Sequence, residues 1–207
     1  MISFKEFRQD ILRGHVTNLI LAAVWATFAL NSISAYLLTR QTVLVAFFVF
    51  ETLTLVFFLV RTRAVRTSST LSDWVSAFVG TFTGLLFVPG IPTAFWHAGS
   101  ILFWIGIVGE LVSLSSLNRS FAIVPSLRMI KTGGMYRLIR HPLYASHLLA
   151  YLGYLLQSFS LRNAVIFLIV LLCMLLRIKN EERYLAEEAA YRAYQKKVRW
   201  RLIPFIF

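Results

Sequence analysis

The chain has 207 residues, of which 58% are hydrophobic, and it carries a formal net charge of +12 with a mean hydropathy of +0.70. This apolar share is above that of an ordinary soluble domain. The basic residues stand between long apolar runs, a distribution that suits lipid head groups and argues against a nucleic-acid partner. The four histidines and the single Cys173 show no metal-ligand spacing, so we expect neither a metal site nor a disulfide framework.

The chain begins with a mixed-charge segment, residues 1–15, which predicts a short helix at the membrane interface and no cleavable signal peptide. Six apolar stretches follow. A helix needs about 20 apolar residues to cross the hydrocarbon core, and the first four stretches satisfy this. The last two are short and closely joined, which predicts a tight helical hairpin. We therefore predict an all-α, polytopic membrane bundle of about six transmembrane helices, over residues 16–38, 42–60, 74–95, 98–117, 143–159 and 163–177.

The basic residues also predict the orientation in the membrane. If the N-terminus is cytoplasmic, all of the 21 Lys and Arg except Arg40 and Arg162 fall on the cytoplasmic side. The positive-inside rule then places both termini in the cytoplasm. In a prokaryotic cell the membrane would be the plasma membrane.

Two long basic segments, 118–142 and 178–207, lie on that cytoplasmic side. Pro and Gly residues prevent the first from forming one continuous helix. The second begins as a charged helix and then offers an apolar stripe, so we expect an amphipathic helix lying on the membrane. We accordingly divide the chain into a four-helix membrane region, 1–117, and a region that carries the chemistry, 118–207. The stripe consists of Tyr184, Tyr191, Tyr194 and Val198.

The segment 133–144 has the features of an anion-binding turn. Pro142 suits the first turn of a helix, where a missing N–H costs nothing. Arg140 and His141 then lie beside free backbone N–H groups and the positive end of the helix dipole. Tyr136 and Tyr144 add aromatic faces for a cation or a flat ring. One site here would suit a ligand with a carboxylate, a positive centre and an aromatic base.

A second set of charged residues follows the last apolar stretch. Arg177 and Glu181 are four residues apart, so they share one helix face at the membrane boundary. A hairpin would return them to the surface that carries His141. The arginine suits an anionic group, and the glutamate suits an ammonium, ribose hydroxyls or a proton-accepting role.

These motifs together resemble the isoprenylcysteine carboxyl methyltransferase and phospholipid methyltransferase family of integral membrane methyltransferases. The likeness covers roughly residues 118–204 and rests on the motifs Gly134–Tyr144 and Arg177–Leu185, followed by Tyr191, Tyr194 and Pro204. It implies methyl transfer from S-adenosylmethionine, bound in a cytoplasm-facing pocket, to a lipid-like or isoprenoid acceptor with a carboxylate or an amine. Membrane lipids and a lipophilic or lipidated acceptor are thus the expected partners.

The resemblance also implies roles for single residues. Arg177 would orient the acceptor, and Glu182 would take a proton from an amine acceptor. Met135, Ser146 and Glu188 depart from the family pattern near these motifs. The implied cofactor-binding residues are Arg128, Met129, Ile130, Lys131, Tyr136, His141, Pro142, Leu143, Tyr144 and Glu181.

Two other functions stay open at this stage. Membrane sterol reductases, which bind NADPH, have a similar C-terminal helical arrangement, but no additional phosphate-binding cluster is evident here. A transporter or assembly factor would instead depend on the intramembrane acids Glu51 and Glu110, yet no inverted repeat supports it. His147 reads as a packed, hydrogen-bonded histidine.

Overall fold

The computed structural model describes the backbone of residues 4–40, 43–88 and 91–207. Its contacts divide the chain into two compact units, Met1–Arg63 and Ala64–Phe207, which are described separately. Regular structure in both described units is almost entirely helical, so the predicted all-α membrane bundle is confirmed. The functional division at residue 117 stays a prediction.

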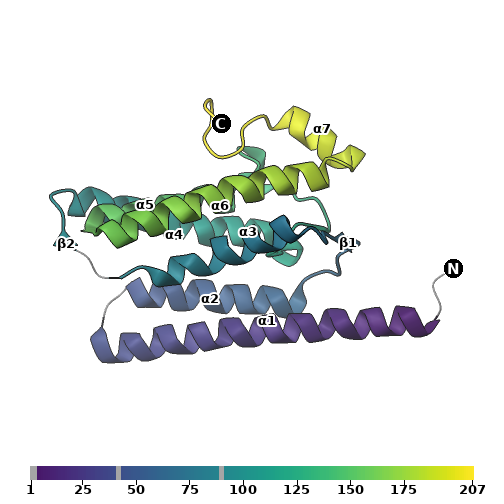
Figure 1. Ribbon diagram of the computed structural model, residues 1–207, viewed down its shortest axis with the longest axis horizontal. Helices are drawn as coiled ribbons and strands as arrows, with labels where there is room; N and C mark the ends of the chain where they lie inside the picture. Colours follow the sequence, from purple (N-terminus) through teal and green to yellow (C-terminus); the bar gives the residue numbers. More distant parts are fainter. Residues whose placement is uncertain (1–3, 41–42, 89–90) are drawn as a thin grey trace. The chain divides into compact units, whose positions relative to one another are not determined.

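The first unit is a pair of helices, α1 (Phe4–Thr39) and α2 (Val43–Val60), which pack along each other (Figure 1). Helix α1 is continuous from Phe4, so the predicted short interfacial helix is in fact the first part of α1. Trp25 packs on Phe58 with ring centroids 5.1 Å apart. Ser32 Oγ donates a hydrogen bond of 2.7 Å to the Glu51 carboxylate, which gives this intramembrane acid a polar partner.

Among its described residues, the second unit contains the remaining helices and four two-residue strands. Strand β1 pairs with β3 and β2 pairs with β4, both antiparallel. The helices are α3 (Leu71–Phe82), η1 (Thr83–Leu86), α4 (Trp96–Leu117), η2 (Asn118–Ser120), η3 (Gly134–Arg137), α5 (Pro142–Gln157), α6 (Leu161–Leu185) and α7 (Ala189–Lys197), and the strands are β1 (Arg66–Thr67), β2 (Ile91–Pro92), β3 (Ser126–Leu127) and β4 (Ser158–Phe159).

Three helices in the described residues are long and apolar enough to cross a membrane, at His15–Thr39, Trp96–Ser120 and Leu161–Leu185, and Leu44–Val60 is a shorter apolar helix. The predicted hairpin is present as α5 and α6. The predicted span over 74–95 is wrong as a single helix, because α3 ends at Phe82. Beyond η1, the buried Asn163 holds the chain at Val88, because its side chain accepts from Val88 N at 3.1 Å and donates to Val88 O at 2.9 Å.

Helices α4 and α5 approach each other so closely that their interface depends on glycine. A Cβ on Gly106 would lie 2.4 Å from the backbone nitrogen of Ala150. Small residues allow such close backbone approach between helices in a membrane. The same interface pairs Glu110 with His147, whose Nδ1 lies 2.9 Å from the Glu110 carboxylate. Both residues therefore contribute to helix packing, which for His147 agrees with the sequence-based interpretation.

Replacing Gly106 with alanine should force α4 and α5 apart. Overpacking of this kind costs about 1–3 kcal/mol, which corresponds to a fall of several degrees in the apparent thermal midpoint of the detergent-solubilised protein. Gly133→Ala is the matched control, because nothing lies within 4 Å of a Cβ built there. Equal midpoints for the two variants would contradict the proposed role of Gly106.

Candidate functional site

A pocket in the second unit opens between the segment after α4, the start of α5, the C-terminal part of α6 and α7. It brings together the two motif segments, 133–144 and 177–185, as the predicted hairpin implies. Pro142 and Glu182 are not among its lining residues. The predicted site residues that do line it are Arg128, Met129, Ile130, Lys131, Tyr136, His141, Leu143, Tyr144, Arg177 and Glu181.

The turn that leads into α5 is fixed by its backbone. Pro142 occupies the start of α5, as predicted. The N–H of Arg140 donates to Trp200 O and that of His141 to Arg201 O, both at 2.9 Å. Upstream, Gly134 has a φ of +58°, and a Cβ there would lie 2.5 Å from Ser116 Oγ. Glycine is therefore required at this position for both its conformation and its space.

Glu182 is buried and lies at the centre of an ionic network. Arg140 Nε donates to one carboxylate oxygen at 2.6 Å, and Arg201 Nε donates to the other at 2.8 Å. His141 Nε2 lies 3.2 Å from the first oxygen. Both oxygens of Glu182 are engaged, and Glu182 does not line the pocket. This geometry therefore gives no support to its predicted role as a proton acceptor.

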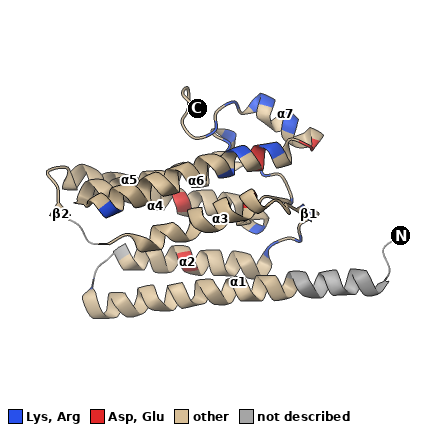
Figure 2. Ribbon diagram, in the orientation of Figure 1, with Lys and Arg blue, Asp and Glu red and all other residues tan. Residues whose placement is uncertain are grey.

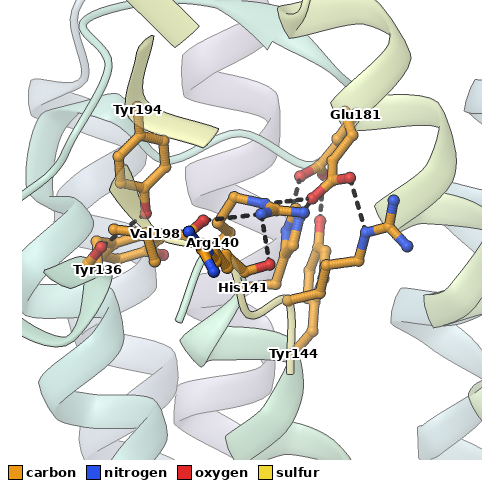
Figure 3. Close-up of polar contacts among 10 residues, drawn as sticks. Tyr136, Arg140, His141, Tyr144, Glu181, Tyr194 and Val198 are labelled. Atoms are coloured by element: carbon orange, nitrogen blue, oxygen red, sulfur yellow. Dashed lines mark hydrogen bonds and ion pairs between the residues drawn. The ribbon is translucent and has the colours of Figure 1, made fainter. Parts of the chain in front are cut away.

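Glu181, the neighbouring acid, faces the pocket. Its carboxylate accepts a hydrogen bond from the Tyr144 hydroxyl, and His141 Nδ1 lies 3.8 Å from its second oxygen. The rings of His141 and Tyr144 stack in parallel with centroids 5.6 Å apart. Figure 3 shows these three side chains converging from α5 and α6. The arrangement holds one carboxylate at the pocket wall with two aromatic rings beside it.

Arg177 lines the same pocket and is 6% exposed. Nη1 donates to Thr81 Oγ1 at 3.2 Å, and Nη2 donates to the carbonyl of Ile123 at 2.9 Å. The guanidinium carbon lies 4.8 Å from the centre of the Tyr144 ring. Sequence reasoning missed Thr81 and Ile123, because neither belongs to a motif and neither is near Arg177 in the chain.

Three of the four residues of the predicted apolar stripe face the protein, whereas Tyr184 belongs to α6 and contacts the Arg66 guanidinium. Tyr191, Tyr194 and Val198 form a buried cluster, and Tyr194 donates a 2.7 Å hydrogen bond to the carbonyl of Tyr136. The expected contact of this stripe with the membrane is therefore corrected to a contact with the pocket wall. Burial raises the pKa of Tyr194 to about 12 and raises those of Tyr136 and Tyr191 as well, so these phenols stay neutral at ordinary pH.

Arg201 was also missed, although it supplies one of the cations that hold Glu182. The sequence indicated that a cationic partner was needed, but not which residue would supply it. Adjacent acids at Glu181 and Glu182 in a chain of such basic character require cationic partners once one of them is buried. The sequence could not show which of the basic residues in the 178–207 segment would supply the partner.

Fold and site together describe a helical membrane protein with a pocket at the end of its C-terminal hairpin. Charged side chains and tyrosine rings line this pocket. The family model described as phospholipid methyltransferase matches residues 95–192, from α4 to the first turn of α7. This match confirms the resemblance inferred from the motifs and supports a membrane methyltransferase in general terms. Comparison with curated proteins gave no match.

Replacing Glu182 with glutamine should destabilise the protein, because Arg140 would keep a buried charge without its counterion. Removing one partner of a buried ion pair typically costs about 3–5 kcal/mol. Glu187→Gln is the matched control, since Glu187 is 56% exposed and pairs with the exposed Arg66. That control should change stability by less than about 1 kcal/mol. Similar thermal midpoints for the two variants would refute the structural role of Glu182.

Proposed function

We propose that the protein transfers a methyl group from S-adenosylmethionine to a lipid-like or isoprenoid acceptor that carries a carboxylate or an amine. The observation that carries the proposal is the meeting of His141 and Tyr144 with Arg177 and Glu181 at one pocket. The family match to membrane methyltransferases supports the reaction type.

The donor set of the pocket suits the parts of S-adenosylmethionine. Glu181 offers a fixed carboxylate for its ammonium or its ribose hydroxyls. The N–H groups at the start of α5, together with Arg128 and Lys131, offer positive charge for its carboxylate. Tyr136 and Tyr144 line the pocket with aromatic faces, which attract a cationic sulfonium and stack on a flat base.

Once bound, S-adenosylmethionine supplies a methyl group that bonds to the acceptor's lone pair while the carbon–sulfur electron pair stays on sulfur. The residues of the chain contribute alignment and exclusion of water. Arg177 orients an anionic oxygen of the acceptor. A carboxylate acceptor needs no base, whereas an amine acceptor also has to release a proton, which passes to water.

We further propose a multi-pass orientation with this pocket on the cytoplasmic side, at the plasma membrane in a prokaryotic cell. In the second unit, Lys and Arg gather toward the C-terminal end of α6 and on α7 (Figure 2). Arg162 lies at the opposite end of α6. This separation agrees with the positive-inside rule.

Calorimetry with S-adenosylmethionine tests cofactor binding. Glu181→Gln should weaken binding at least about tenfold, because a hydrogen bond to a charged group contributes about 1.5–3 kcal/mol. Glu187→Gln should bind as the wild type does, since Glu187 lies on the exposed surface with Arg66. Equal affinity in Glu181→Gln and the wild type would refute the assignment of Glu181.

Transfer of label tests the reaction itself. Incubation of the protein with methyl-labelled S-adenosylmethionine and a total lipid extract should yield a labelled lipid, whose identification gives the acceptor. Binding of NADPH in a spectroscopic titration, in place of S-adenosylmethionine, would instead indicate a reductase.

A further inference from the structure

Arg177 is held by a residue that lies outside the segment matched by the family model. Thr81 belongs to α3, whereas the match begins at residue 95. Its hydroxyl accepts the hydrogen bond from Nη1, while the carbonyl of Ile123 accepts from Nη2. The two terminal nitrogens of the guanidinium are thus fixed from different segments of the chain.

The packing of α3 on α6 brings Thr81 to this position. A Cβ on Gly80 would lie 3.1 Å from Cys173 Cβ and 3.5 Å from Arg177 Cδ. Cys173 precedes Arg177 by four residues, so both lie on the face of α6 that meets α3. The absence of a side chain at Gly80 therefore lets α3 approach closely enough for the neighbouring hydroxyl to reach the guanidinium.

The remaining nitrogen of the guanidinium, Nε, is buried and has no hydrogen-bond partner among the residues that the structure describes. Leaving a buried donor unpaired is costly. Since Arg177 lines the pocket, an anionic oxygen of a bound molecule would satisfy this donor. The guanidinium carbon also lies over the Tyr144 ring, 4.8 Å from its centre, which gives the cation an aromatic contact.

We infer that Thr81 is a positioning residue: by holding Nη1 it fixes the plane of the Arg177 guanidinium, so that the unpaired Nε donor meets the anionic group of the methyl acceptor. This inference rests on the proposed function. It adds α3 to the working site, and it predicts that loss of the hydroxyl affects the acceptor and not S-adenosylmethionine. Misplacement of an orienting group by a fraction of an ångström lowers the rate because alignment is what the group supplies.

The test compares hydroxyl-free and hydroxyl-retaining variants at residue 81. Thr81→Val and Thr81→Ala should lower the maximal rate of label transfer to a total lipid extract about tenfold. Both should leave the calorimetric affinity for S-adenosylmethionine within about twofold. Thr81→Ser keeps the hydroxyl and should restore the rate. Thr83→Val, at the residue that follows α3, is the matched control and should transfer label as the wild type does.

A double-mutant cycle separates positioning from a general effect on folding. In an Arg177→Lys background the bond to Thr81 is already disrupted, so adding Thr81→Val should lower the rate by less than about twofold. A full tenfold loss in that background would overturn the inference, as would an unchanged rate in the hydroxyl-free variants. Impairment of Thr81→Ser equal to that of Thr81→Val would overturn it too.

The calorimetric measurement of S-adenosylmethionine binding distinguishes a failure of the proposed function from a failure of the role of Thr81. A wild-type protein that binds no S-adenosylmethionine would overturn the proposed function, and this inference with it. A wild-type protein that binds the cofactor and transfers label, beside hydroxyl-free variants that do so equally well, would overturn only the role of Thr81. Weaker cofactor binding in Thr81→Val would also overturn it, because Thr81 would then shape the cofactor site.

Discussion

The buried carboxylate of Glu182 is the interaction on which the candidate site depends. An ionised group inside a protein is costly unless cations and hydrogen bonds compensate for lost water. Arg140 and Arg201 provide that compensation from two segments far apart in the sequence. Backbone hydrogen bonds from Arg140 N–H to Trp200 O and from His141 N–H to Arg201 O join the same two segments. The start of α5 is thereby fixed against the end of α6 and the segment after α7.

The geometry of α6 then gives its two adjacent acids different tasks. Successive residues of a helix are about 100° apart around its axis, so Glu181 and Glu182 point in different directions. Glu182 enters the ionic network, whereas Glu181 turns toward the pocket together with Arg177, one turn earlier. Helix α6 therefore supplies both Glu182, which holds the site together, and the charged residues that line the pocket. Because Glu182 is fixed by its partners, the rotation of α6 about its axis is fixed, and Arg177 and Glu181 face the pocket.

Sequence reasoning reached the parts of this arrangement that local patterns encode. Pro142 marked the start of α5, and the spacing of Arg177 and Glu181 placed both at one helix face. The partners of Glu182 were beyond such reasoning, because the 178–207 segment alone holds seven Lys and Arg residues and only packing selects Arg201. Asn163 is similar: within the predicted span over 74–95 it binds Val88, a residue 75 positions away. Hydropathy alone cannot register a contact of that kind.

The polar side chains within the apolar helices distinguish between the functions considered from the sequence. Glu51 has Ser32 as its partner within the first unit, and Glu110 has His147 across the α4–α5 interface. Acids engaged in helix–helix contacts satisfy a structural need, so their presence does not require a transport pathway. Glu181 differs from both, because it stands near the C-terminal end of α6 and at a pocket wall with aromatic neighbours. Glu181 is thus the acid that a ligand in the pocket would meet, and it lies among the residues of the motifs that resemble membrane methyltransferases. This placement favours an enzyme over a transporter.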